Sequence, residues 1–322
     1  MATAEQLKVL IRSHFDGDQD RFTTIALQVA AHEARQGHTD VANDIRQLVD
    51  QAKSSARILP IHKELDDLIL ASDPALRLCD LVVPTGQRKR LERVLREYRQ
   101  QERLRAHGMT CRRKLLFTGP PGTGKTMSAT VLAGELHLPL FTVLMDRIVT
   151  KFMGETSAKL RQVFHVIGEV RGVYLFDEFD AIGAERALDN DVGEMRRVLN
   201  SFLQFIERDR SDSLVIAATN NLRLLDQALF RRFDDVLHYG LPSDEEAKHL
   251  ITNRLGKFRP KTLPLAAIAK DAETLSHAEI AQACDDAIKE AILADKSSVS
   301  AALLRGMLAD RRSAYGKVRG KG

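Results

Sequence analysis

The chain has 322 residues, of which 44% are hydrophobic and 29% are charged, and its formal net charge is +4. This composition is ordinary for a globular protein with a packed core, and the length allows one to three domains. The small net charge does not by itself imply a nucleic-acid partner, and no stretch approaches the length of a membrane span.

The cysteines of the chain are few and scattered. Cys79, Cys111 and Cys284 are odd in number and far apart. They have neither the spacing of a metal site nor that of a disulfide framework. Scattered cysteines of this kind fit a protein of the reducing cytoplasm. The N-terminus has no apolar run, so we expect no signal peptide and no membrane span.

Residues 1–55 are predicted to form helices, because their apolar residues recur at intervals of three and four. A short connecting helix is expected over Ile61–Leu70, and the turn Ser72-Asp73-Pro74 puts the first domain boundary near residue 75. Residues 1–75 thus form an N-terminal helical domain without a catalytic pattern. Two roles stay equally open: an appendage that stabilises packing or an oligomer, and a docking module for a substrate or adaptor.

A helix with an apolar stripe and a basic face is predicted over Thr85–Ala106. A basic face is a candidate nucleic-acid contact, but no aromatic residues interleave with it for base stacking. Pairs at i,i+4, Glu92–Arg96 and Arg93–Glu97, favour a solvated helix face instead. Nucleic acid is therefore not the expected partner. The apolar stripe consists of Leu91, Val94, Leu95 and Tyr98.

From Lys114 onward, apolar runs alternate with helical segments, which is typical of an α/β fold with a parallel sheet. After Gly240 only helices are predicted, beginning with a capping box of Ser243 and Glu246. We expect an α/β domain over residues 76–240, a helical lid over 241–316 and a basic tail over 317–322. The predicted strands are Lys114–Thr118, Leu140–Leu144, Val173–Asp177, Leu214–Thr219 and Asp235–Tyr239.

The loop after the first of these strands matches the phosphate-binding pattern G-x-x-x-x-G-K-[ST] at every fixed position. Glycines let the backbone curl so that successive N–H groups point at an anion, and the following helix adds its positive end. Lys125 is expected to reach the outer phosphates of a nucleotide, and the Thr126 hydroxyl to bind Mg²⁺. The strand–loop–helix context argues against a chance glycine-rich turn. The nucleotide-binding residues are Gly119, Pro120, Pro121, Gly122, Thr123, Gly124, Lys125, Thr126 and Met127.

Two carboxylates, Asp177 and Glu178, end the strand that begins at Val173. At the carboxyl end of a parallel strand beside a phosphate loop, such side chains face the ligand crevice. Asp177 is expected to hold Mg²⁺ through water, and Glu178 to polarise the water that attacks the γ-phosphate. An apolar strand that merely ends in acids is the alternative, and the upstream phosphate loop disfavours it.

From about Leu76 to Arg312 the chain resembles the AAA+ ATPases, and specifically the AAA subgroup in the narrow sense. Ala217-Ala218-Thr219-Asn220 is similar to the sensor-1 strand, whose Asn220 reports on the γ-phosphate. Leu225–Asp234 is similar to the arginine-finger region, with Arg231 and Arg232 as candidate fingers. Lys151, Phe152 and Met153 resemble the aromatic pore loop that contacts the substrate. Other matches are Asp180–Gly183 with Arg186, just past the acidic strand, and Ser276–Ile280, the start of a lid helix that has no sensor-2 arginine.

The chain also departs from the subgroup. Arg231 and Arg232 are adjacent where the subgroup has Pro-Gly between two arginines, so either one is the candidate finger. The entry motif is half kept, as Asp80–Val83, and Asn253 corresponds to a lid position where the family has a histidine near the adenine. No H-E-x-x-H motif occurs, so the chain is not itself a fused zinc protease.

The resemblance implies a P-loop AAA+ module, with a five-stranded parallel sheet, flanking helices, a C-terminal helical lid and an N-terminal helical unit. It implies catalysis by Asp177, Glu178, Asn220, Arg231 and Arg232, with ATP and Mg²⁺ as cofactors and Thr126 and Asp177 as metal-binding residues. A homo-oligomeric ring, expected to be a hexamer, would remodel, unfold or thread a protein substrate, with a separate protease as a candidate partner. The alternatives are a nucleic-acid-acting or clamp-loader-type ATPase, and a nucleotide switch that serves as a scaffold.

Overall fold

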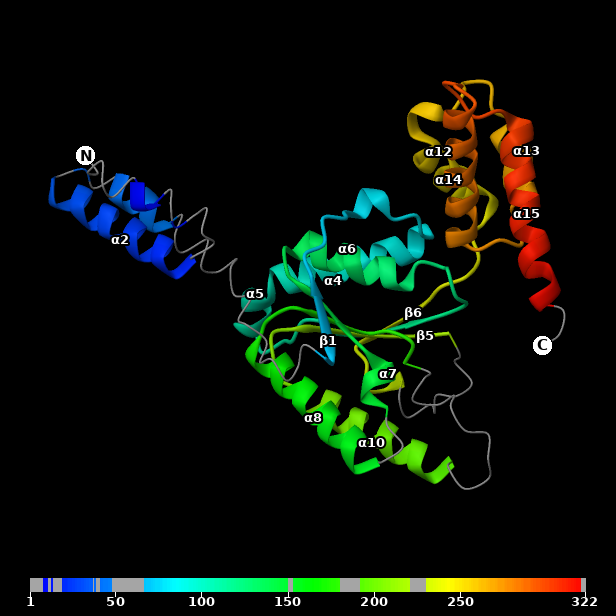
Figure 1. Cartoon of the computed structure of the whole chain (residues 1–322). Helices are drawn as coiled ribbons and strands as arrows, with labels where there is room; N and C mark the ends of the chain where they lie inside the picture. The colour runs from blue at the N-terminus through cyan, green and yellow to red at the C-terminus, as the bar shows by residue number, and fades with distance from the viewer. Residues whose placement is uncertain are drawn as a thin grey trace. The chain divides into compact units, whose positions relative to one another are not determined.

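Figure 1 shows the computed structural model of the whole chain. The chain divides into two units, Met1–Pro60 and Ile61–Gly322. The structure describes residues 8–10, 13, 19–36, 38, 41–47, 67–149, 153–179, 192–220 and 230–319.

The first unit is helical where it is described, as the sequence predicts. Helix α2, Gln19–Arg35, buries Ala26, Val29 and Ala30 on one face at three- and four-residue spacing. Residues 41–47 are also helical. In that helix Val41 is 49% exposed, and Ala42 is buried.

Among the described residues of the second unit, six strands form one sheet in the order β1-β3-β4-β5-β2-β6. The bonded neighbours from β3 to β6 are all parallel. These strands confirm the five predicted ones to within one residue at each end. They are β2 (Lys114–Thr118), β3 (Leu140–Val143), β4 (Val173–Phe176), β5 (Leu214–Thr219) and β6 (Asp235–His238).

The sixth strand, β1 (Ile69–Ser72), pairs antiparallel with β3 at one edge of the sheet. The prediction of a helix over Ile61–Leu70 is therefore wrong for its described part, since residues 67 and 68 form a turn and Ile69 and Leu70 lie in the strand; residues 61–66 lie outside the described residues. Only Ile69 of this strand is buried, and the four residues Ile-Leu-Ala-Ser do not alternate between apolar and polar in the way that predicts a strand. The pairing with β3 decides its conformation, and it places Ile69–Ser72 in the sheet, ahead of the boundary expected near residue 75.

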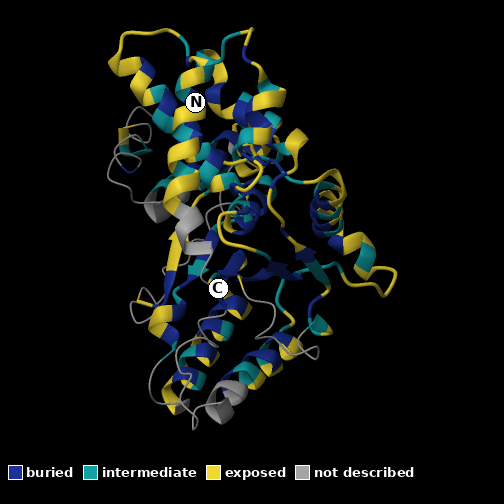
Figure 2. Cartoon of the chain, turned by 90° about the vertical axis from the view of Figure 1, so that its right-hand side faces the viewer, coloured by how far each residue is buried: buried dark blue, intermediate teal, exposed yellow. Residues whose placement is uncertain are grey.

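Helices cover both faces of the sheet (Figure 1). On one face lie α4 (Thr85–Arg99) and α6 (Lys125–Leu136), and on the other lie α8 (Met153–Glu169) and α10 (Val192–Arg208). Alternate strand residues enter the two cores: Phe117 packs on the α4 and α6 side, and Phe176 packs on the other. Figure 2 shows the central strands as buried, whereas most of the edge strand β1 is exposed.

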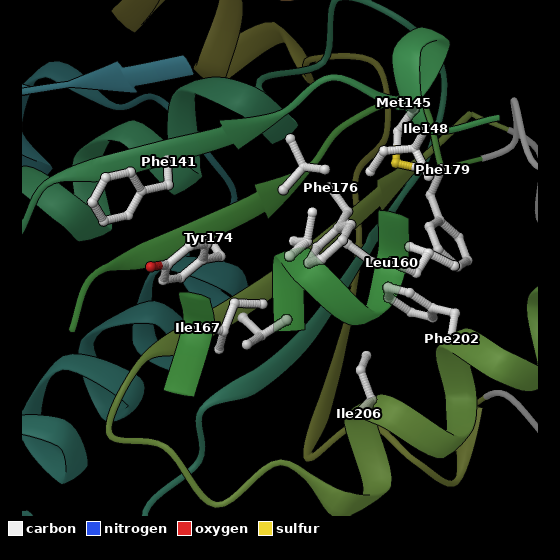
Figure 3. Close-up of a cluster of buried hydrophobic side chains, with 14 of the residues drawn as sticks. Phe141, Met145, Ile148, Leu160, Ile167, Tyr174, Phe176, Phe179, Phe202 and Ile206 are labelled. Atoms are coloured by element: carbon white, nitrogen blue, oxygen red, sulfur yellow. The ribbon is translucent and has the colours of Figure 1, made fainter. Parts of the chain in front are cut away.

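An aromatic cluster fills the core on the α8 and α10 side (Figure 3). Phe141 stacks on Tyr174 with ring centroids 4.8 Å apart, and Phe176 meets the edge of Phe202 at 5.0 Å. Phe179, just beyond β4, lies 4.5 Å from Phe202. Because these rings are fully buried, they fix the end of β4, where the predicted catalytic acids follow.

The predicted helix Thr85–Ala106 is interrupted at Gln100 and continues as α5, Gln101–Arg105. Its apolar stripe is buried, as expected. The expected pairs are wrong, because Glu92 bonds to Arg88 and Glu97 bonds to Arg112. Other arginines of this face pair with acids on other elements, among them Arg90 with Asp235, Arg99 with Glu135 and Arg105 with Asp212. Much of the predicted basic face is thus neutralised within the fold.

The lid consists of α12 (Asp244–Leu255), α13 (Leu265–Asp271), α14 (His277–Leu293) and α15 (Ala301–Arg319). The predicted capping box of Ser243 and Glu246 begins α12, and Ser276 with Glu279 begins α14 in the same way. In the last turn of α14, Ile292 is 53% exposed. Helix α15 reaches Arg319, so the first residues of the expected tail are helical.

Candidate active site

The predicted phosphate loop, acids and sensor asparagine follow three neighbouring strands. In the sheet β4, β5 and β2 lie side by side and parallel. Asp177 follows β4, Asn220 follows β5, and Gly119 follows β2. Because the carboxyl ends of parallel strands meet at one edge, these residues are brought together there.

The backbone of the phosphate loop adopts conformations that require glycine. Gly119, Gly122 and Gly124 have φ of 145°, 73° and 97°. A Cβ on Gly119 would lie 2.0 Å from the Tyr239 carbonyl oxygen, and one on Gly122 would lie 2.6 Å from Ser276 Oγ. The loop therefore touches strand β6 on one side and the lid on the other.

Lys125, the first residue of α6, is 6% exposed. Its ammonium donates hydrogen bonds to the carbonyl oxygens of Gly119 and Pro120, at 2.8 and 2.9 Å. It also donates to Asn220 Oδ1 at 2.8 Å, which links the loop to the end of β5. The positive charge of Lys125 thus lies at the mouth of the loop, where it can pair with an anion bound there.

Thr126 and Asp177 form an oxygen-rich pair beside the loop. Thr126 Oγ1 donates a hydrogen bond to Asp177 Oδ2 at 2.6 Å, and the Glu178 amide donates to Asp177 Oδ1 at 2.9 Å. A hydroxyl and a carboxylate oxygen are the hard ligands that Mg²⁺ takes in phosphate sites. The donor set therefore fits Mg²⁺ bound together with phosphate.

Glu178 has a left-handed backbone, with φ of 50°, and its side chain is exposed. Non-glycine residues rarely adopt this conformation, which costs of order 1–3 kcal/mol and is concentrated at active sites. Phe179 holds the turn, because it is buried and its amide donates to the Ala218 carbonyl at 2.8 Å. The turn leaves the Glu178 carboxylate open to the cavity beside Asp177.

The side chains of Lys125, Thr126, Asp177, Glu178 and Asn220 line one cavity. Its volume of about 800 Å³ is large enough for a nucleotide. The phosphate loop and the acids line one end, and lid residues from α12 and α14 line the other. The Ala278 amide donates to the Gly122 carbonyl at 3.0 Å, so the lid and the loop are joined directly. The half-kept entry motif, Asp80 to Val82, and the predicted Asn253 also line the cavity.

Two lining residues, Arg254 and His277, were not predicted from the sequence. Arg254 is adjacent to Asn253, and His277 is the first residue of α14. Burial lowers the pKa of His277, so its imidazole is held in the neutral form. His277 lies in the segment Ser276–Ile280 that the sequence matched to the start of a lid helix, but the match gave this histidine no role, and Arg254 lies in no motif. The packing of the lid against the loop brings both residues to the cavity.

The candidate finger residues lie away from this cavity. Arg231 is exposed and makes no ion pair or hydrogen bond with any residue that the structure describes. Arg232 Nε lies 3.6 Å from Glu207 Oε2, at the end of α10. Asp234 accepts the Arg113 and Lys114 amides, each at 2.9 Å, which ties the segment to the start of β2. Neither arginine lines the cavity of its own chain.

The predicted pore loop falls largely outside the described residues. Lys151 and Phe152 lie there, as do Asp180–Gly183, Arg186 and residues 221–229 of the finger region. Met153 is the first residue of α8.

Comparison with known proteins agrees with this geometry. The sequence model of the "ATPase family associated with various cellular activities (AAA)" matches residues 115–241. An uncharacterized AAA family ATPase, y4kL of Sinorhizobium fredii, is 33% identical over 311 residues, which cover 93% of this chain and 92% of that protein. The chain belongs to the AAA family of ATPases. It is therefore an ATP hydrolase, built on the P-loop α/β fold that its sequence predicts.

Other relatives of this AAA ATPase are similar over a smaller share of the chain. The ATP-dependent zinc metalloprotease FtsH 2 of Thermoanaerobacter sp. is 33% identical over 193 residues, 58% of this chain and 37% of that protein. A proteasome-activating nucleotidase of Methanococcus maripaludis is 31% identical over 215 residues, 64% of this chain and 51% of that protein. The chain thus spans about half or less of these two relatives. Within its described part, no helix has the length and apolarity that crossing a membrane requires.

Cys79 offers a chemical test of the cavity, because it is exposed and lines the cavity wall. The other thiols are protected: burial raises the pKa of Cys284 to about 12, and partial burial raises that of Cys111. We expect N-ethylmaleimide to modify Cys79 first and ATP to slow that reaction. Mass spectrometry of peptides after timed labelling measures both, with Cys111 and Cys284 as internal controls. Equal labelling of Cys79 with and without ATP would contradict this placement of the nucleotide.

Proposed function

We propose that this ATPase couples Mg²⁺-dependent ATP hydrolysis to the remodelling, unfolding or threading of a protein substrate. The observation that carries the proposal is the shared cavity, which contains Lys125, Thr126, Asp177, Glu178 and Asn220. The names of two relatives point to work on proteins, since one is an ATP-dependent zinc metalloprotease and the other a proteasome-activating nucleotidase.

Each residue has a role in the proposed hydrolysis. Lys125 would exchange its contacts with loop carbonyls for the outer phosphates, and Thr126 and Asp177 would hold Mg²⁺. The bound metal supplies neutralisation of the charge that develops on the phosphates. Glu178 would take the proton of the attacking water, and Asn220 would orient that water or the γ-phosphate.

A homo-oligomeric ring, expected to be a hexamer, completes the proposed site. Arg231 is exposed and does not line the cavity of its own chain, so it is available to a neighbouring copy. An arginine supplied in trans stabilises the charge of the phosphoryl-transfer transition state. We assign Arg231 this role, because Arg232 is already paired with Glu207.

The proposal also covers the partners and the cellular compartment of the protein. A separate protease is a candidate partner, and the cytoplasm is the proposed compartment. Nucleic acid is not the proposed partner, because Arg90, Arg99 and Arg105 are paired with acids of the fold. The rival functions are a nucleic-acid-acting ATPase and a nucleotide switch with little turnover.

The test measures ATPase rates with an unfolded protein, with DNA and with neither. We expect stimulation by the unfolded protein alone, and we expect Phe152→Ala to abolish it while the basal rate and the melting temperature stay near those of the wild type. An aromatic ring offers a passing chain a large, rigid contact at little cost in rotamer entropy.

The alternative for Phe152 is a core residue that caps the sheet. In that case Phe152→Ala would cost about 3–5 kcal/mol of folding stability. Phe141→Ala is the matched control, because Phe141 is fully buried and its loss must lower the melting temperature. If Phe152→Ala melts as early as Phe141→Ala, the pore contact is wrong, and stimulation by DNA alone would favour the nucleic-acid-acting class.

A further inference from the structure

Arg254 is held in a fixed plane at the lid end of the cavity. It belongs to α12, and its Nε and Nη2 donate to Asp285 Oδ1 and Oδ2 of α14, each at 2.6 Å. Two parallel bonds of this kind fix the orientation of a guanidinium, which a single contact does not do. Because Asp285 occupies one edge of the group, the two flat faces remain for other contacts.

The cavity is polar at one end and largely apolar at the other. Lys125, Thr126 and the acids line the loop end, which suits phosphates and a metal ion. Toward the lid the wall includes Leu76, Leu81, Val82, Leu250 and Ala281. A nucleotide with its phosphates on the loop therefore extends its nucleoside toward α12 and α14.

We propose that Arg254 is a nucleobase-binding residue whose guanidinium, held by Asp285, stacks on the face of the bound base. The proposal rests on the nucleotide site assigned above. An arginine over an aromatic ring is attracted by the π-system, and the attraction grows where water is excluded. His277, the other lining group here that can carry a positive charge, is held neutral by burial, so it does not compete as a second cation.

The simpler role for Arg254 is that of a brace between two lid helices. A comparable brace exists in the same lid: Arg305 Nε lies 3.0 Å from Asp271 Oδ2 and joins α15 to α13. Its side chain is 47% exposed, close to the 52% of Arg254, but Arg305 does not line the cavity. Arg305→Ala therefore removes a lid ion pair without touching the nucleotide site.

The experiment measures the affinity for ADP by calorimetry and the affinity for tripolyphosphate, which has no base, by its competition against ADP. The strength of an arginine over an aromatic ring predicts that Arg254→Ala weakens ADP binding roughly three- to thirtyfold. Tripolyphosphate affinity is expected to stay at the wild-type value. Arg254→Lys keeps the charge but loses the planar guanidinium, so its loss of ADP affinity should be nearly as large as that of Arg254→Ala. Arg305→Ala should leave both affinities unchanged.

Three results would overturn the proposal: an ADP affinity of Arg254→Ala within twofold of the wild type, an equal loss of tripolyphosphate affinity, or full rescue by Arg254→Lys. A loss of ADP affinity in Arg305→Ala equal to that in Arg254→Ala would also overturn it, since any lid brace would then suffice. Failure of the underlying site is distinct, because Lys125→Ala would then bind ADP as tightly as the wild type.

Discussion

Glu178→Gln is expected to bind ATP with wild-type affinity and to hydrolyse it roughly 10²–10⁴-fold more slowly, the range that a positioned base contributes. The carboxamide keeps the shape of the side chain but does not accept the proton of the attacking water. The exposed carboxylate and the strained turn that presents it make this position the candidate base. Steady-state turnover and ATP affinity, measured on the same purified protein, test the assignment.

Two companion variants make the result specific. Lys125→Ala should lose ATP binding itself, because it removes the cation at the mouth of the loop. Glu92→Gln, on the surface of α4, removes a carboxylate of similar size that pairs only with Arg88 among the described residues, and it should change neither quantity. Wild-type turnover in Glu178→Gln would refute the proposed base.

Arg231→Ala is expected to lower turnover by about 10³–10⁵-fold, the contribution of an arginine supplied in trans, with ATP affinity nearly intact. Arg232→Ala should have a smaller effect that Glu207→Gln reproduces, because those two side chains pair with each other. If Arg232→Ala proves the more damaging substitution and Glu207→Gln is harmless, the assignment of the two arginines is reversed.

Mixing separates a finger in trans from one in cis. Arg231→Ala and Glu178→Gln subunits are each expected to be inactive, yet their mixture should regain part of the activity. Some mixed interfaces pair an intact base with an intact finger, which no pure preparation contains. A mixture as inactive as its components, or a wild-type turnover that is constant on dilution far below ring assembly, would contradict the trans arrangement.

The central parallel strands β2, β4 and β5 could be predicted because they are largely apolar and buried on both faces. Strand β1 could not be, since it is set by pairing with β3 and buries only Ile69. The ion pairs that α4 makes with other elements were missed for a related reason: Arg90 and Asp235 are distant in sequence, and i,i+4 spacing carries no information about them.

The residues of the site also differ in whether the sequence could predict them: those in a contiguous motif could be predicted, and those brought in by tertiary packing could not. The phosphate loop is one contiguous motif, so its residues could be named from the sequence. Arg254 and His277 come to the cavity only when the lid helices pack, and the pairing of Arg232 with Glu207 joins segments that share no motif. Contacts fixed by tertiary packing leave no periodic trace in a single chain.

The three glycines of the phosphate loop are constrained for different reasons, which bears on how such a motif evolves. Gly119 is excluded from change by the Tyr239 backbone, before any nucleotide binds. Gly122 is limited by Ser276 of the lid and also by its φ of 73°, so a drift in the lid would remove only one of its two constraints. Gly124 has open space around it and is constrained by its backbone angle alone. Folding, lid docking and loop conformation thus limit the three glycines to different degrees, and we expect the three positions to change at different rates in a lineage that abandoned ATP.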